Sequence, residues 1–237
     1  MFNTNIPIYG VMILLALVSN VIIVLLIYKK YSFTKEEIIG AIVYENIGII
    51  LGAKIFSFIE NYKLYKEFDF IKIGLSSYGA VIGAVIFLVI FSLQFKKSIK
   101  EMLFTFMPSI PLMYAIGKIG CFLVGCCHGI EYSGPLSISY KYSLFAKANI
   151  GYFPIQIVES IVFILIFIYA INKAIKNRFN ARVLSISCIL CGFSKFILEY
   201  LRFSHNSVDI SLTQIISITF IFAGLVLWYI DRKDKKL

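Results

Sequence analysis

The chain has 237 residues, of which 59% are hydrophobic and only 15% are charged, and its mean hydropathy is +0.87. So little charge cannot cover the surface of a soluble domain of this length, which excludes that class and indicates a membrane protein. The formal net charge of +10 does not indicate a nucleic-acid-binding protein, because the Lys and Arg residues stand mainly in short segments between apolar stretches.

Seven apolar segments follow one another along the chain, each long enough, or nearly so, to cross about 30 Å of hydrocarbon as a helix. The first is not typical of a signal peptide, because no Lys or Arg precedes it and no small-residue cleavage site follows it. The sequence therefore predicts an all-α integral membrane protein, a single polytopic domain over residues 1–237 with seven transmembrane helices around a polar cavity. The segments cover residues 6–28, 38–59, 73–95, 102–125, 153–171, 183–202 and 210–230.

The distribution of positive charge predicts the orientation. On one side, the loops and the C-terminal tail carry Lys29, Lys30, Lys35, Lys96, Lys97, Lys100, Lys173, Lys176, Arg178, Arg182, Arg232, Lys233, Lys235 and Lys236. The opposite side carries fewer, namely Lys63, Lys66, Lys72, Lys141 and Lys147. The positive-inside rule then places the N-terminus outside and the C-terminus in the cytoplasm. The longest external loop, about 126–152, contains an alternating fragment at 136–140 that favours a short strand.

Several charged residues fall within or at the ends of the apolar segments. A charged side chain at the bilayer centre costs about 3 kcal/mol, so a set of them indicates a polar interior. Any single one of them could instead form an interhelical ion pair or extend to the membrane surface. The set is Glu45, Lys54, Lys118, Glu159, Lys195, Glu199 and Arg202.

The segment 183–202 carries its polar residues on one face. Cys188, Cys191, Lys195, Glu199 and Arg202 are spaced by 3, 4, 4 and 3 residues, which places them on a stripe about 80° wide in a helix. The pairs Lys195/Glu199 and Glu199/Arg202 have helical ion-pair spacing. The stripe is either a self-neutralising ladder or, with one positive charge left over, part of a site for an anionic headgroup.

The segment Gly-Lys-Ile-Gly-Cys-Phe-Leu-Val-Gly-Cys-Cys-His-Gly at 117–129 combines glycines, cysteines, a lysine and a histidine. The Cys-Cys-His run at 126–128 and the pair Cys188 and Cys191 have ligand types that zinc uses. The predicted topology places them near opposite ends of helices, about 20 Å or more apart. We therefore expect no shared metal site and interpret the cysteines as packing residues.

Two segments also carry a small-xxx-small pattern, Gly48/Gly52 in one and Gly79/Gly83 in the next. Small residues at this spacing let the backbones of membrane helices approach closely. The pattern predicts helix-packing faces.

Motifs along nearly the whole chain resemble those of the bacterial prolipoprotein diacylglyceryl transferase family, in the same order. They are Tyr9-Gly10, Gly52-Ala53-Lys54, Ser76-Ser-Tyr78-Gly79, the 117–129 segment, Pro154-Ile-Gln156-Ile-Val-Glu159, Gly192-Phe-Ser-Lys195-Phe-Ile-Leu-Glu199-Tyr-Leu-Arg202 and Gln214-Ile-Ile-Ser217. The resemblance implies a multi-pass enzyme of the bacterial cytoplasmic membrane. It would move the diacylglyceryl group of phosphatidylglycerol to the lipobox cysteine thiol of a prolipoprotein, releasing glycerol phosphate.

The resemblance also implies partners and site residues. The partners are phosphatidylglycerol or another anionic phospholipid, a prolipoprotein signal peptide and the membrane, with no nucleic acid, cofactor or metal. Catalytic roles fall on Tyr78, Lys118 and Lys195. Substrate-binding roles fall on Tyr9, Lys54, Gly79, Gly120, Cys121, Gln156, Glu159, Glu199 and Arg202.

This chain differs from the family pattern at several of these positions. Tyr78 stands where the family has histidine, Cys126 where it has glutamate, and Cys121 and Val124 where it has asparagines. Lysines, among them Lys118, replace arginines, and a lysine is a point charge without the bidentate fork of arginine.

Three functions therefore stay open. The chain is a divergent transferase of this kind, a related enzyme with another donor or acceptor, or a non-enzymatic member that binds anionic phospholipid or a partner protein. Intramembrane charges also occur along ion pathways, which is the basis of a transporter hypothesis. Tyrosine has a pKa of about 10, so for Tyr78 we favour hydrogen bonding to the lipid over action as a base.

Overall fold

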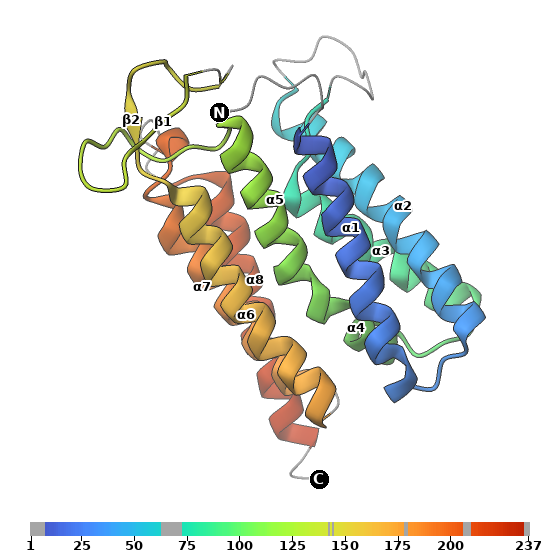
Figure 1. The fold of residues 1–237 in the computed structure, drawn as a ribbon. Coiled ribbons are helices and arrows are strands. Elements are labelled where there is room, and N and C mark those ends of the chain that lie inside the picture. Colours follow the sequence, from blue (N-terminus) through green and yellow to red (C-terminus); the bar gives the residue numbers. More distant parts are fainter. Residues whose placement is uncertain are drawn as a thin grey trace. The chain divides into compact units, whose positions relative to one another are not determined.

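The computed structural model describes residues 8–62, 73–141, 143, 145–177, 180–205 and 210–234. The chain divides into two compact units. Unit 1 comprises Met1–Asn20 and Pro108–Leu237, and unit 2 comprises Val21–Met107. The described residues contain seven helical spans that are long and apolar enough to cross a membrane, which confirms the predicted fold class (Figure 1). Six of the basic residues that the predicted orientation uses lie outside the described residues, namely Lys63, Lys66, Lys72, Arg178, Lys235 and Lys236.

Unit 2 is built mainly from two long helices and one short one. A capping box starts the first of them: Glu37 N–H donates to Thr34 Oγ1 at 3.3 Å, and Thr34 N–H donates to the Glu37 carboxylate at 3.0 Å. Unit 2 comprises the last part of α1 (Ile8–Ile27), the 3₁₀ turn η1 (Tyr28–Lys30), α2 (Lys35–Glu60), α3 (Ser77–Gln94) and α4 (Ile99–Phe106). Its core comprises Val24, Tyr28, Ile38, Ala41, Leu88, Phe91, Met102 and Phe106.

Glycines let α2 and α3 pack closely. A Cβ atom on Gly52 would lie 2.2 Å from the carbonyl oxygen of Gly79, and a Cβ atom on Gly48 would lie 2.4 Å from that of Gly83. Real Cβ atoms do not approach a backbone oxygen so closely, so side chains at these positions would force the helices apart. The predicted packing faces are confirmed, and we call this contact the glycine seam (Gly48, Gly52, Gly79 and Gly83).

Unit 1 contains the remaining long helices and a small sheet. Strands β1 (Ile138–Ser139) and β2 (Gly151–Tyr152) pair antiparallel, with Ile138 opposite Tyr152. The short strand expected within 136–140 is therefore present. The helices are the first part of α1, α5 (Ile110–Val124), α6 (Ile155–Asn177), α7 (Ala181–Glu199) and α8 (Leu212–Asp234), and the 3₁₀ turn η3 covers Phe203–His205.

The predicted segment 102–125 corresponds to one of the seven spans, Ile99–Val124, which a 3₁₀ turn interrupts. Helix α4 ends at Phe106, the 3₁₀ turn η2 spans Met107–Ser109, and α5 begins at Ile110. Pro108 lies inside the turn; proline has no N–H to donate, and its ring clashes with the preceding turn of an α-helix. The boundary between the two units also falls at Pro108.

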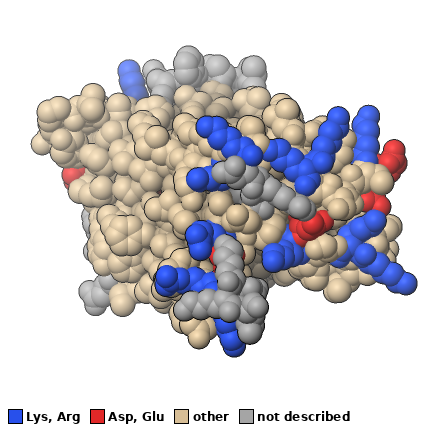
Figure 2. Space-filling view, turned by 90° about the horizontal axis from the view of Figure 1, so that it is seen from below, with Lys and Arg blue, Asp and Glu red and all other residues tan. Residues whose placement is uncertain are grey.

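Basic residues gather at one end of the helices within each unit. In unit 2, Lys35 begins α2 and Lys97 follows α3, where it pairs with Glu37. In unit 1, Arg182 near the start of α7 lies 3.5 Å from Asp231 near the end of α8. Figure 2 shows a face of the molecule on which Lys and Arg gather, with few Asp and Glu. The cytoplasmic placement of these ends stays a prediction.

Candidate active site

A fully buried carboxylate, that of Glu159 in α6, lies among polar groups of two other helices of unit 1. Lys118 Nζ of α5 is 2.6 Å from Oε2, and Lys195 Nζ of α7 is 2.7 Å from Oε1. The Tyr114 hydroxyl also donates to Oε1, at 3.0 Å. Because burial strengthens each of these interactions, the carboxylate holds α5, α6 and α7 together.

A second carboxylate, that of Glu199, continues the chain of ion pairs. Its Oε2 lies 3.1 Å from Arg202 Nη1 and 3.8 Å from Lys195 Nζ. Its Oε1 accepts a hydrogen bond of 3.4 Å from Ser211 Oγ. Three cations thus meet two carboxylates, which leaves one positive charge in a site from which solvent is largely excluded. We call this set the ion ladder: Lys118, Glu159, Lys195, Glu199 and Arg202.

The Tyr114 ring supports both lysines of the ladder. Lys118 Nζ is 5.3 Å and Lys195 Nζ 5.4 Å from its ring centroid. An ammonium at this distance from an aromatic face is attracted by about 0.5–2 kcal/mol. The ring therefore stabilises two like charges that would otherwise repel each other across the carboxylate.

Two buried donors near the ladder have no acceptor among the described residues, namely Arg202 Nε and Gln214 Nε2. Gln214 is held in place at the start of α8, because its N–H donates to Ser211 Oγ at 3.2 Å and its Oε1 accepts from Ser211 N–H at 3.0 Å. A buried unsatisfied donor costs about 1–3 kcal/mol. These N–H groups are therefore available to an anionic ligand.

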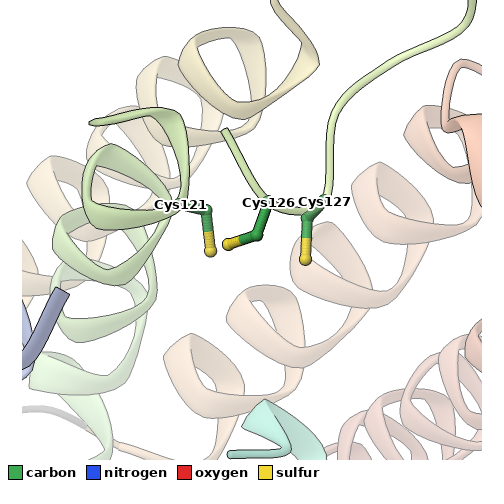
Figure 3. Close-up of side chains that lie close together, drawn as sticks. All are labelled: Cys121, Cys126 and Cys127. Carbon is green, nitrogen blue, oxygen red and sulfur yellow. The ribbon is translucent and has the colours of Figure 1, made fainter. Parts of the chain in front are cut away.

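Three thiols come together at the end of α5, one from its last turn and two from the residues that follow the helix. The Sγ atoms of Cys121, Cys126 and Cys127 lie within 4.8 Å of one another, and Figure 3 shows the Cys126 side chain pointing toward that of Cys121. Gly125, with φ of 76°, ends the helix, and Cys126 N–H then donates to Cys121 O at 3.1 Å. This left-handed helix cap brings Cys126, the residue after the glycine, into contact with Cys121, four residues before the glycine. We call these residues the thiol cluster.

Sequence reasoning missed the thiol cluster. It compared the Cys-Cys-His run at 126–128 with Cys188 and Cys191, and it treated Cys121 separately as a substrate-binding position. The signal was present, because a glycine that ends a helix between Cys121 and Cys126 predicts a contact between those two residues.

Backbone pairing holds the segment after the thiol cluster against the end of α7. Ile130 N–H donates to Leu201 O at 3.0 Å, and Phe203 N–H donates to His128 O at 3.2 Å. Gly129 therefore forms a β-bridge with Arg202. Helix α7 ends at Glu199, three residues before the end of the predicted segment 183–202.

The Cys127 thiol has a pKa below its usual range. Hydrogen bonds with the other two thiols lower this pKa, and the positive charges of Lys118 and Arg202 lower it further.

Other predicted site residues of unit 1 lie near these groups. Gln156 is fully buried, and its Nε2 donates to Cys126 O at 2.9 Å while its Oε1 accepts from the Tyr140 hydroxyl at 3.3 Å. A Cβ atom on Gly120 would lie 3.3 Å from the ring of Tyr9, so α1 packs against α5 at this glycine. Binding of substrate by these residues stays a prediction.

The remaining predicted site residues belong to unit 2. Lys54 Nζ donates to Ile73 O at 2.5 Å. Tyr78 lies half-buried in the first turn of α3. Gly79 is part of the glycine seam. The roles predicted for these three residues in catalysis or lipid binding stay predictions.

Comparison with known proteins identifies the family. The family model described as prolipoprotein diacylglyceryl transferase matches residues 1–230. A phosphatidylglycerol–prolipoprotein diacylglyceryl transferase of Clostridium tetani is 31% identical over 245 residues, covering 100% of this chain and 97% of its own length. One from Clostridium perfringens is 28% identical over 241 residues, with 98% and 93% covered. The chain therefore belongs to the prolipoprotein diacylglyceryl transferase family, multi-pass proteins of the bacterial cytoplasmic membrane that transfer diacylglyceryl groups to prolipoproteins.

Proposed function

We propose that this chain transfers the diacylglyceryl group of phosphatidylglycerol to the lipobox cysteine of a prolipoprotein, with an altered set of residues around the reaction. The observation that carries the proposal is the ion ladder, which keeps one positive charge in a buried site. The names of the relatives from Clostridium tetani and Clostridium perfringens support the same donor and acceptor. A phosphodiester headgroup has one negative charge, which matches the charge that the ladder leaves over.

In the ion ladder, a lysine can contact the lipid phosphate without leaving Glu159 unpaired. Glu159 is shared by Lys118 and Lys195, so one ammonium can turn to a phosphate oxygen while the other keeps the carboxylate paired. Arg202 Nε needs no such exchange, because none of the described residues accepts from it. Charge-assisted hydrogen bonds of this kind are the strong ones.

The chemistry requires stabilisation of the leaving group. The acceptor sulfur, as a thiolate, attacks the glyceryl carbon bonded to the phosphate oxygen. The carbon–sulfur bond forms, the carbon–oxygen bond breaks, and its electron pair leaves with glycerol phosphate. Charge grows on that phosphate during the step, so cations fixed beside it lower the barrier.

A second candidate function is the binding of anionic phospholipid without transfer. The observation that favours it is the pairing within the ladder, because each carboxylate already contacts two cations. Buried ion pairs of this kind also occur where they serve only to hold helices together. The resemblance of the sequence motifs, which places Tyr78 where the family has histidine, points in the same direction.

One assay distinguishes diacylglyceryl transfer from lipid binding without transfer. The full chain is placed in nanodiscs with phosphatidylglycerol labelled in its acyl chains, and a peptide containing a lipobox cysteine is added. We expect label on the peptide as a thioether, and none on a peptide with serine in place of that cysteine. Arg202→Gln should lower both lipid binding and transfer, whereas Arg182→Gln, which removes a half-exposed side chain of the same unit, should change neither. Phosphatidylglycerol binding without any labelled peptide would replace the transfer proposal with the second candidate.

A further inference from the structure

We propose that the thiol cluster is a binding site for a thiophilic divalent cation such as Zn²⁺, with Cys121, Cys126 and Cys127 as ligands and a fourth position for the acceptor cysteine. The metal site follows from the geometry of the three thiols. Its use of the fourth position rests on the proposed function.

The distances suit three thiolate ligands on one ion. In a tetrahedral site with Zn–S bonds of about 2.3 Å, neighbouring sulfur atoms lie about 3.8 Å apart. The three Sγ atoms of the cluster lie within 4.8 Å of one another, so small side-chain rotations bring them to ligand distance. A disulfide would use two of these thiols and leave the third beside it without a role.

The backbone holds the ligands in place before any ion binds. The left-handed cap at Gly125 joins Cys126 to Cys121, and Gln156 of α6 fixes the Cys126 carbonyl. Cys127 itself has a φ of 53°, a conformation that is costly for a residue with a side chain and persists where the surroundings impose it. Such support outside the ligand set is typical of metal sites.

The histidine next to the cluster is not a fourth ligand. His128 Nδ1 lies 3.1 Å from Gly129 O, and Nε2 lies 3.1 Å from Phe145 O. Both ring nitrogens thus face backbone carbonyl groups. Among the described residues, the cluster is the one group of three or more Cys, His, Asp or Glu side chains close enough to share an ion. Three protein ligands with an open position are typical of catalytic rather than structural zinc.

The open position supplies one chemical step, the removal of the proton from the acceptor thiol. A phenol is a poor acceptor for the proton of the substrate thiol, and Tyr78 stands where the motif that this chain resembles has histidine. A thiol that coordinates Zn²⁺ loses its proton outright. The proton passes to solvent, and the metal-bound thiolate sulfur attacks the glyceryl carbon as glycerol phosphate departs. The thioether product is neutral, binds the ion weakly and leaves the site.

Metal binding is tested first, without lipid or peptide. The full chain is purified in detergent with a phosphine reductant, stripped with a chelator and titrated with Cd²⁺ alone, while thiolate-to-metal charge-transfer absorption is recorded. We expect one Cd²⁺ per chain. Cys126→Ser should weaken binding by about tenfold or more, and the Cys188→Ser/Cys191→Ser double variant should bind as the parent does. The site is disproved if the charge-transfer band is missing or is equally strong in a Cys121→Ser/Cys126→Ser/Cys127→Ser variant.

A second measurement covers the case in which a variant fails to fold. The unaltered chain is labelled with a maleimide, with and without Zn²⁺, and the modified cysteines are identified by mass spectrometry. We expect Zn²⁺ to protect Cys126 and Cys127, the latter being the exposed member of the cluster, and to leave labelling of Cys188 unchanged. Equal labelling with and without Zn²⁺ contradicts the site, and so does a disulfide between two cluster cysteines in protein purified without reductant.

The role of the ion is tested separately from the transferase proposal. In the nanodisc assay, transfer should fall on chelation and return when Zn²⁺ is added. Cd²⁺ binding without any transfer would leave the metal site standing and overturn the proposed function. Transfer at the parent rate by the triple serine variant would leave the function standing and overturn the catalytic use of the ion.

Discussion

The glycine seam of unit 2 and the ion ladder of unit 1 hold helices together in opposite ways. Lipid tails are as apolar as leucine, so membrane helices need close packing or polar contacts to associate. In the seam, glycines without side chains let the two helix backbones come into contact, as at Gly52 and Gly79. The ladder places charged groups of three helices around Glu159. The seam is therefore sensitive to added volume and the ladder to lost charge, and the ladder alone carries groups that can act on a phosphate.

The largest effect should come from removing the central carboxylate of the ladder. Glu159→Gln keeps the shape but leaves Lys118 without its carboxylate partner and Lys195 with only Glu199, at 3.8 Å, which should lower the free energy of unfolding by about 3–5 kcal/mol. Denaturant titration in detergent micelles measures this. The control is Arg182→Gln, which removes a side chain that is 50% exposed, and where we expect about 0–1 kcal/mol. Equal stability of Glu159→Gln and the parent would show that the ladder does not hold the helices.

Removing one cation should affect lipid binding more than it affects folding. Lys118→Ala leaves Glu159 paired with Lys195, so the fold should survive. Loss of a charged hydrogen bond should weaken phosphatidylglycerol binding by about 1.5–3 kcal/mol. Titration of the lipid followed by native mass spectrometry gives the affinity, with Lys118→Arg as the charge-preserving control. If Lys118→Ala binds phosphatidylglycerol as the parent does, Lys118 is not part of the headgroup site.

A Gly→Ala substitution should lower the stability of the fold at the glycine seam and leave it nearly unchanged at a glycine with open space around it. The Cβ atom of Gly52→Ala would meet the Gly79 carbonyl oxygen at 2.2 Å, and such overpacking costs about 1–3 kcal/mol. Gly117→Ala is the matched control, because a Cβ atom there has no neighbour within 4 Å among the described residues. It should be neutral or stabilise its helix by up to about 1 kcal/mol. Equal unfolding midpoints for both variants would contradict the seam.

The smallest effect concerns Tyr78, next to the seam in sequence. If its hydroxyl donates to the lipid, Tyr78→Phe should weaken lipid binding by about 0.5–1.5 kcal/mol and leave the pH profile of transfer unchanged. If Tyr78 is a base, the same variant should lose transfer while lipid still binds.

Tyr78→His sharpens this test. Histidine accepts a thiol proton near neutral pH, because its unperturbed pKa is about 6.5. The variant should therefore preserve or raise transfer to a lipobox peptide. If both parent and variant are inactive, the assignment of diacylglyceryl transfer to this chain weakens and lipid binding without transfer becomes the better account.

The sequence by itself determined the features that depend on spacing along one element. Hydropathy predicted seven spans, the 3- and 4-residue steps from Cys188 to Glu199 predicted one polar face, and the glycines at 48 and 52 predicted close packing. Each follows from the fixed geometry of a helix, which the local sequence is enough to define. The motifs likewise indicated membership of the transferase family, because their order along the chain can be read from the sequence alone.

Only the tertiary structure decided which faces meet. It placed Glu159 of α6 between Lys118 of α5 and Lys195 of α7, and it bridged Gly129 to Arg202 across more than seventy residues of sequence. Helical spacing gives the direction of a side chain from its own axis, but not the partner helix or the depth at which two helices cross. Ion pairs between elements therefore depend on the packing of the whole unit, whereas the polar stripe that contributes to them does not.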